Sequence, residues 1–200
     1  LIREGGITIY PLLLASVVSV AVIIDKFFEF YVIKRTVRLL HPQMIKFLES
    51  KDYHKMDNIL SENIYCKNLY EAIIHNLDKP LEAIKKLAKI GLEKDAEDLR
   101  RYTWLLGTLG SMAPFIGLFG TVLGIMKAFN NIAAVGSGGF SVVASGISES
   151  LISTAAGLLV GVLSIFFYNF FTIKANHLES RLESNKEEML IVLETRLNKK

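Results

Sequence analysis

Three long runs of uncharged residues dominate the pattern of apolar and polar positions along the chain. The first extends from Ile7 to Ile24, the second from Thr103 to Met126, and the third from the neighbourhood of Glu149 to Ile173. Each run is long enough to cross roughly 30 Å of hydrocarbon as a helix. The pattern therefore predicts an all-α membrane protein with three transmembrane helices.

The first run is followed by a mixture of charged and aromatic residues, Asp25 to Tyr31, which is typical of an anchor at the membrane interface. A cleaved signal peptide would have a shorter apolar core and a small-residue cleavage site after it, and the sequence lacks both features. We therefore expect residues 1–33 to form a retained first transmembrane helix together with its interfacial anchor.

The helical pattern continues beyond the other two runs. From Leu81 the apolar positions recur at helical spacing into the second run, which predicts one helix from Pro80 to about Ala133. Past the third run, an apolar seam continues at Leu178, Leu182, Met189, Leu193 and Leu197. The second and third transmembrane helices are therefore expected to extend far into the cytoplasm, packed side by side.

The distribution of charge predicts which side of the membrane each segment faces. Of the 23 Lys and Arg residues, 15 lie between Asp25 and Thr103 and six follow Ile173. Positive charge stays on the cytoplasmic side, so the N-terminus is expected in the periplasm and the C-terminus in the cytoplasm. Acidic residues are mixed with the basic ones, which argues against a nucleic-acid surface.

Together these patterns divide the chain into six expected segments. They are a first transmembrane helix with its anchor (1–33), a cytoplasmic helical domain (34–102), a second transmembrane helix (103–134), a periplasmic loop (135–141), a third transmembrane helix (142–173) and a cytoplasmic C-terminal helix (174–200). No separate catalytic domain is expected in this arrangement.

The residue types that commonly carry catalysis or bind metals show no functional pattern. Cys66 is the chain's one cysteine, which excludes an internal disulfide or a cluster of thiolates. The four histidines lack ligand spacing, and the glycine-rich run at 136–139 lacks the Lys-Ser/Thr of a phosphate-binding loop. We therefore expect a protein that is not an enzyme and that needs neither a cofactor nor a metal.

Small residues instead line one face of each of the last two membrane helices. On the second helix they are Gly107, Gly110, Pro114, Gly117, Thr121, Gly124 and Ala128. On the third helix they are Gly146, Ser150, Thr154, Gly157, Gly161 and Ser164. Spacings of three and four place each set on one stripe, which favours close helix packing in lipid. Alternatively, part of each stripe lines a lumen that holds polar groups or a partner helix. Close packing alone explains the glycines better than it explains Thr121 and Thr154.

Glu149 is the one Asp, Glu, Lys or Arg between Ala128 and Ile173. An acidic residue at the centre of a membrane helix costs roughly 2.5–3.5 kcal/mol on translocon scales, so such a residue is by default a functional candidate. The competing interpretation is structural, with a protonated or interhelically bonded acid that only positions helices. Neither interpretation is excluded by the sequence.

Two stretches on these helices carry a resemblance to a known family. The segment from Ala113 to Met126 resembles the second-helix signature of the ExbB/TolQ/MotA proton-channel family. The segment from Ser141 to Leu158 resembles the third-helix signature, and Tyr168-Asn169 is similar to the exit of that helix. The match is closest to the ExbB/TolQ branch.

The resemblance implies a multi-pass subunit of the bacterial inner membrane that assembles as a homo-oligomeric ring, with five copies. Inside the ring would lie the membrane helices of a single-span partner like ExbD or TolR, whose aspartate takes up and releases protons. In this chain Thr121, Thr154 and Glu149 match the polar channel positions of the family. Proton flow would move the partner and energise outer-membrane transport, with a TonB- or TolA-like protein as a further partner.

Three alternatives remain open at this point. One is a TolQ-like role in envelope maintenance, which the sequence does not separate from an ExbB-like role. Another is a MotA-like stator subunit, although that branch usually has four spans and a larger cytoplasmic domain. The last is a membrane scaffold that conducts no ions and whose small-residue faces merely pack against each other and lipid.

Overall fold

The computed structural model describes residues 7–50, 58–60, 65–135 and 140–197, and every regular element in these ranges is an α-helix. The helices are α1 (Ile9–Ser50), α3 (Asn68–Ile74), α4 (Leu81–Arg100), α5 (Thr103–Val135) and α6 (Phe140–Leu197). Three of them, α1, α5 and α6, are long and apolar enough to cross a membrane. The predicted all-α class with three long apolar helices is thereby confirmed.

The chain forms two compact units. Unit 1 comprises residues 1–25 and 102–170, and unit 2 comprises residues 26–101 and 171–200. The described part of unit 1 therefore holds the start of α1, all of α5 and the first part of α6. Unit 2 holds the remainder of α1 and α6 together with α3 and α4.

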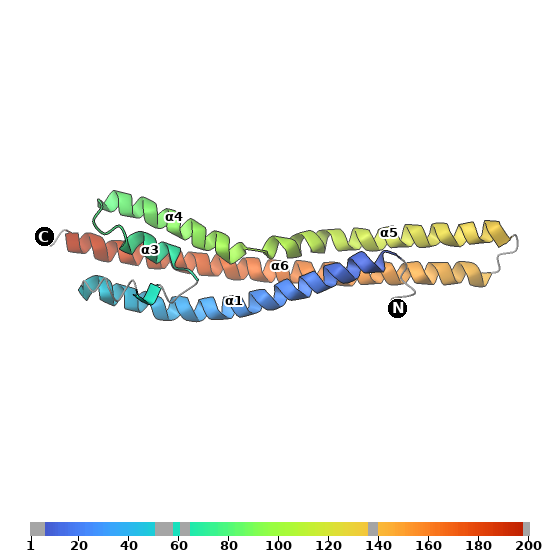
Figure 1. Cartoon of the computed structure of the whole chain (residues 1–200), viewed down its shortest axis with the longest axis horizontal. Coiled ribbons are helices and arrows are strands. Elements are labelled where there is room, and N and C mark those ends of the chain that lie inside the picture. The colour runs from blue at the N-terminus through green and yellow to red at the C-terminus, as the bar shows by residue number, and fades with distance from the viewer. Residues whose placement is uncertain (1–6, 51–57, 61–64, 136–139, 198–200) are drawn as a thin grey trace. The chain divides into compact units, whose positions relative to one another are not determined.

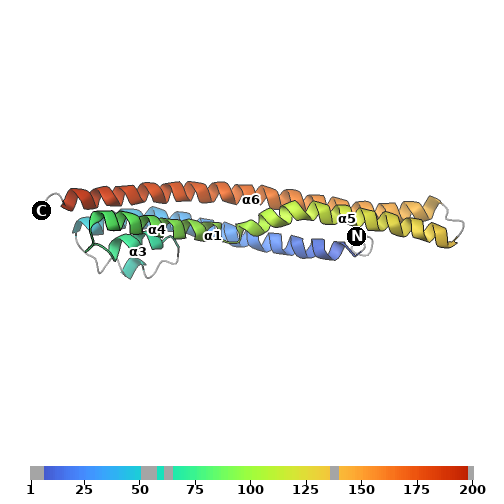
Figure 2. The same ribbon diagram turned by 90° about the horizontal axis from the view of Figure 1, so that it is seen from above.

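Unit 1 has small residues between its helices and large apolar residues on its surface. Figures 1 and 2 both show α5 lying along the first part of α6. Outward-facing side chains include Val17, Phe115 and Leu159, which are 67%, 72% and 62% exposed. Apolar surface of this extent suits a helix surrounded by lipid rather than by water.

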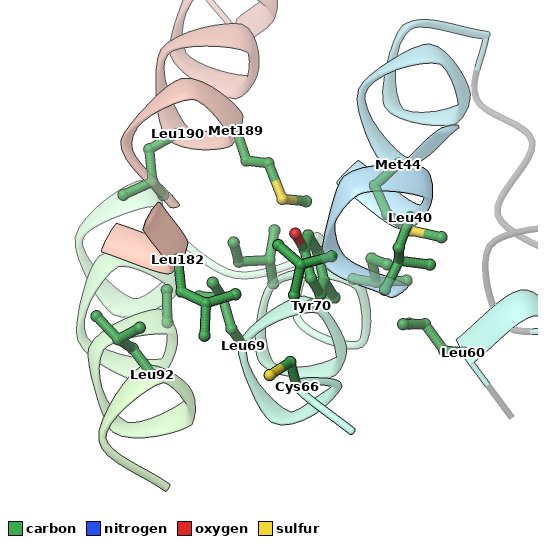
Figure 3. Close-up of a cluster of buried hydrophobic side chains, with 14 of the residues drawn as sticks. Leu40, Met44, Leu60, Cys66, Leu69, Tyr70, Leu92, Leu182, Met189 and Leu190 are labelled. Atoms are coloured by element: carbon green, nitrogen blue, oxygen red, sulfur yellow. The ribbon is translucent and has the colours of Figure 1, made fainter. Parts of the chain in front are cut away.

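Unit 2 has an ordinary hydrophobic core, to which α1, α3, α4 and α6 all contribute (Figure 3). Leu69 and Tyr70 of α3 are fully buried at its centre, and Met44 and Met189 approach from α1 and α6. The Tyr70 hydroxyl accepts a hydrogen bond of 3.0 Å from Asn185 Nδ2, which satisfies the phenol inside an apolar environment.

The short helix α3 is held against α4 by one glycine and one carboxylate. A Cβ atom on Gly91 would lie 2.5 Å from the Asn68 carbonyl oxygen, so only glycine permits this approach. Asp95 accepts hydrogen bonds from the Asn68 backbone N–H (3.2 Å), the Asn68 amide (2.8 Å) and the Leu69 N–H (3.0 Å). The carboxylate thereby satisfies backbone donors at the start of α3.

The prediction of one continuous helix from Pro80 to about Ala133 was wrong. Helix α4 ends at Arg100, Arg101 has an extended ψ of 134°, and Tyr102 has a left-handed φ of 62° before α5 begins. A left-handed residue other than glycine costs roughly 1–2 kcal/mol, so surrounding contacts must hold this break. By contrast, α6 is one helix from Phe140 to Leu197, and the predicted continuation of the third helix past Ile173 was right.

Candidate functional site

The backbones of α5 and α6 approach each other closely at Gly117 and Gly157. A Cβ atom on Gly117 would lie 3.0 Å from the Thr154 Cα atom and 2.9 Å from the Ser153 carbonyl oxygen. A Cβ atom on Gly157 would lie 2.6 Å from the Ala113 carbonyl oxygen. Because backbone atoms cannot move aside individually, any side chain at either position would force the two helices apart.

The other glycines of the two stripes lie at the same contact. A Cβ on Gly124 would meet Ser150, one on Gly146 would meet Ala128, and one on Gly161 would meet Pro114, each at 2.6 to 2.7 Å. Towards the other end of α5, added Cβ atoms on Gly110 and Gly107 would meet Ile165 and Tyr168. The structure thus brings the two predicted stripes together along the described part of the α5–α6 contact.

Thr121 and Thr154 face each other across this contact, and their hydroxyl groups are in hydrogen-bond contact. Thr154 Oγ1 also donates to the Gly117 carbonyl oxygen at 3.0 Å, and Thr121 Oγ1 lies 3.3 Å from the Ser150 carbonyl oxygen. Each hydroxyl has one proton and two lone pairs, so the pair can exchange donor and acceptor roles. Both side chains are half-buried.

Two further hydroxyl pairs join the start of α1 to α6 in unit 1. Thr8 Oγ1 lies 3.3 Å from Ser153 Oγ, and Ser19 Oγ lies 2.9 Å from Ser164 Oγ. Sequence reasoning placed Ser164 on the stripe of α6 but missed its partner. The sequence offered one signal, which is that Thr8 and Ser19 lie three helical turns apart in a mainly apolar run.

Glu149 lies within α6, one residue before Ser150, but its side chain is outside the described part of the structure. The predicted loop at 135–141 likewise falls mainly on residues 136–139, which the structure does not describe. Lys127 of α5 is exposed. The geometry on which a functional argument can be built is therefore that of the glycines and the threonine pair.

Two buried side chains of unit 2, Asp95 and Cys66, have shifted pKa values and belong to the packing of this unit. Burial raises the pKa of the Asp95 carboxyl above its ordinary value, although the hydrogen bonds from Leu69 and Asn68 act in the opposite direction. Burial also raises the pKa of the Cys66 thiol, which is therefore a poor nucleophile. Among the described residues, the structure contains no group of three or more side chains that could hold a metal ion.

These observations define an all-α protein with three apolar helices of membrane-spanning length, two of which pack through glycines around a pair of hydroxyls. The chain belongs to the MotA/TolQ/ExbB proton channel family, whose sequence profile matches residues 55–184. The family is one of channel and transport subunits rather than of enzymes. Membership and the three apolar helices together support an inner-membrane protein.

Individual relatives come from both named branches of the family. The biopolymer transport protein ExbB of Salmonella typhimurium is 32% identical over 196 residues, covering 90% of this chain and 78% of the relative. ExbB of Pseudomonas putida is 30% identical, covering 94% and 59% of the two chains. The Tol-Pal system protein TolQ of Pseudomonas aeruginosa is 32% identical over 121 residues, covering 60% and 52%.

Proposed function

We propose that this chain forms the wall of a proton channel in an inner-membrane complex of the ExbB–ExbD or TolQ–TolR type. The observation that carries the proposal is the contact between the Thr121 and Thr154 hydroxyls at a glycine-lined helix pair. A pair that can exchange donor and acceptor roles can hold water or a carboxyl group in either protonation state. Family membership supports protons as the transported species.

The threonines need a titrating partner, because a hydroxyl group of this kind does not ionise near neutral pH. We assign the proton-accepting role to an aspartate on a single-span ExbD- or TolR-like subunit. Its membrane helices would lie inside a homo-oligomeric ring of this chain, with five copies. The N-terminus of each copy would face the periplasm and the C-terminus the cytoplasm.

Glu149 is proposed as a modulator of proton access to that aspartate. A carboxylate near a second carboxyl group favours its protonated form, and so raises the local affinity for protons. Glu149 lies in α6 one turn before Ser153, the neighbour of Thr154. Its titration would adjust how readily the proton reaches the site between the threonines and the partner.

The energy for the work comes from the membrane potential. Each proton that crosses contributes about 2.3 kcal/mol per 100 mV, so a few protons supply enough energy to move a helix against its neighbours. In an ExbB-type complex the motion would reach outer-membrane transporters through a TonB-like protein. The TolQ relatives support a second candidate, in which a TolA-like protein carries the same motion to envelope maintenance.

Proton flux in proteoliposomes tests the proposal. Vesicles that hold this chain with its single-span partner should conduct protons under an applied potential, and Thr121→Val and Thr154→Val should each reduce the flux. Thr108→Val is the matched control, because Thr108 is exposed on the same helix. A scaffold without a conducting role would show no flux with or without the partner.

A further inference from the structure

A fully buried lysine from α1 contacts the C-terminal end of helix α4. Lys26 of α1 is 0% exposed, and its Nζ atom donates to Glu29 Oε2 at 2.6 Å and to the Leu99 carbonyl oxygen at 3.2 Å. The same nitrogen lies 5.8 Å from the centroid of the Phe30 ring. A buried ammonium group is expensive unless it is paired and hydrogen-bonded, so these three contacts explain how the fold tolerates it.

The Leu99 carbonyl is the acceptor that a continuous helix would need. In an α-helix each carbonyl oxygen accepts from the N–H four residues later, which for Leu99 is the N–H of Thr103. In this structure the Lys26 ammonium donates to that carbonyl oxygen in place of the Thr103 N–H, α4 ends at Arg100, and Tyr102 is left-handed. A positive charge at the C-terminal end of α4 also suits the direction of the helix dipole.

The sequence itself favours the alternative, in which α4 and α5 are continuous. The apolar positions keep one helical phase across the break, since Leu99 and Leu106 lie two turns apart and both are buried. Neither Gly nor Pro occurs at Arg101 or Tyr102 to interrupt the helix. The sequence is thus compatible with a continuous helix, whereas the structure has the broken junction and places the Lys26 contact beside it.

A second cation at the same turn provides an internal comparison. Arg100 donates to the Ala96 carbonyl oxygen at 3.1 Å and to Asn176 Oδ1 at 2.9 Å, and it pairs with Glu179. The Arg100 and Glu179 side chains are 41% and 38% exposed, whereas those of Lys26 and Glu29 are 1% and 14% exposed. Exposed pairs contribute little to stability, so the Arg100 pair is a weaker constraint on the end of α4 than the buried Lys26 contact.

We infer that Lys26 is a positioning residue of the channel, which holds the break between α4 and α5 that proton-driven work requires. The inference has two halves, that Lys26 holds the break and that proton-driven work requires the break, and only the second rests on the proposed function. Whether Lys26 holds the break is a matter of local structure, whereas the need for the break depends on proton conduction by this chain. The two halves can be measured separately.

Hydrogen exchange in the detergent-solubilised full chain tests the first half. In Lys26→Met the ammonium no longer competes with the Thr103 N–H for the Leu99 carbonyl oxygen, so the Thr103 amide should form the helical hydrogen bond and exchange at least about tenfold more slowly. Lys26→Met/Glu29→Gln should behave alike, and it avoids leaving a carboxylate without its cation if the single variant folds poorly. Arg100→Met should leave the exchange of Thr103 unchanged. Wild-type exchange in both Lys26 variants would overturn the inference.

Rescue by glycine tests the second half. Glycine adopts the left-handed conformation freely, so adding Tyr102→Gly to Lys26→Met should restore the break, fast exchange at Thr103 and proton flux together. Flux that stays low although exchange is restored would show that Lys26 acts by another route and would overturn the positioning role. If Thr121→Val and Thr154→Val also leave flux unchanged, the proposed function fails, while the exchange results still decide the local role of Lys26.

Discussion

At the α5–α6 contact, the glycines and the threonines have different requirements. The glycines permit close backbone approach, whereas the threonine hydroxyls require hydrogen-bond partners. Gly117 and Gly157 let the backbones approach, and the hydroxyls of Thr121 and Thr154 then lie half-buried between the two helices and need partners. The two threonines satisfy each other and the neighbouring carbonyls. A valine at either position would keep the shape and lose the hydrogen bond between the two hydroxyls together with the carbonyl contacts of the threonine that it replaces.

The first prediction concerns the hydroxyl of Thr154. Thr154→Val should reduce proton flux at least about tenfold, because the pair of hydroxyls that can exchange donor and acceptor roles is lost. Thr154→Ser should retain most of the flux, since serine keeps the hydroxyl. Flux measured in proteoliposomes with the partner subunit separates the two variants, and equal flux in both would show that the hydroxyl is dispensable.

The second prediction concerns the acid of α6. Glu149→Gln keeps the size and hydrogen-bonding capacity of the side chain but cannot titrate, whereas Glu149→Ala loses both properties. If the titration of Glu149 is needed for function, both variants should assemble with the partner subunit but lose the proton-driven work of the complex. Wild-type activity of the Gln variant would instead assign Glu149 a structural role and leave proton transfer to the partner's aspartate.

Sequence reasoning at the residue scale succeeded where helical periodicity alone decides the outcome. Spacings of three and four place Thr121 and Thr154 on the small-residue stripes of their helices, and the structure brings those stripes face to face. The pairing of Thr8 with Ser153 and of Ser19 with Ser164 was not predicted. It depends on how α1 is rotated against α6, which periodicity within α1 does not determine.

At the scale of the helices, one prediction follows from the backbone approach of α5 and α6. Gly117→Leu or Gly157→Leu should separate the helices and destabilise the detergent-solubilised protein by about 1–3 kcal/mol or more, as overpacking does. In the proposed ring, native mass spectrometry should then show fewer intact oligomers. Ala155→Leu adds similar bulk to an exposed position of α6 and should leave assembly unchanged. Intact oligomers in both glycine variants would contradict the role of close packing.

A further prediction concerns the cap of α3 by Asp95. Its pKa is raised above the ordinary value of 3.8, mainly by burial, so the folded state binds the proton more tightly than the unfolded state. Between the raised pKa and 3.8, the stability contributed by Asp95 therefore increases as pH falls and decreases as pH rises. Asp95→Asn should reduce the dependence of the unfolding free energy on pH in this range.

Thermal unfolding of the detergent-solubilised chain across acidic pH measures that slope. Asp95→Asn should also lower stability near neutral pH by about 1–3 kcal/mol, because an amide cannot accept all three hydrogen bonds that the carboxylate accepts. Glu97→Gln is a matched control, because Glu97 is an exposed carboxylate on the same helix and accepts none of these three hydrogen bonds. An unchanged slope in Asp95→Asn would assign the pH dependence to other groups.

The break between α4 and α5 shows what an apolar pattern does not contain. The sequence across Arg101 and Tyr102 is compatible with a helix, and the pattern therefore predicted one. What ends α4 is a side chain far away in sequence, Lys26, on a carbonyl oxygen that every residue possesses. Contacts of this kind depend on tertiary structure, whereas the continuity of α6 follows from its own uninterrupted seam.

At the scale of the whole molecule, the prediction concerns orientation across the membrane. A cysteine at Ser137, in the segment between α5 and α6, should react with an impermeant thiol reagent in cells with a permeabilised outer membrane. A cysteine at Lys79, exposed between α3 and α4, should not react. The reverse labelling pattern would invert the topology derived from the positive charges.

The native thiol interferes little with that measurement. Cys66 is 6% exposed and burial raises its pKa, so both its accessibility and its thiolate content are low. A Cys66→Ala background serves as the control for residual labelling. Labelling at Lys79 that appears only after the inner membrane is disrupted would complete the assignment of sides.

Large-scale features were the most predictable part of the protein. Three apolar runs specify three long helices, because hydrocarbon requires every backbone group to be satisfied within its own helix. Their arrangement into two units, with a soluble-type core around Tyr70 in unit 2, required the tertiary contacts of several helices. The number and length of the helices follow from local sequence. The division of the helices between the two units depends instead on tertiary contacts.

The left-handed turn at Tyr102 also gives the molecule a built-in optical reporter. Trp104, the single tryptophan of the chain, is the second residue of α5 and is 60% exposed. Indole emission shifts with the polarity around the ring, and tryptophan side chains prefer the boundary between lipid and water. The tryptophan fluorescence of the unmodified protein therefore originates beside the backbone break between α4 and α5, where it senses hydration without any added label.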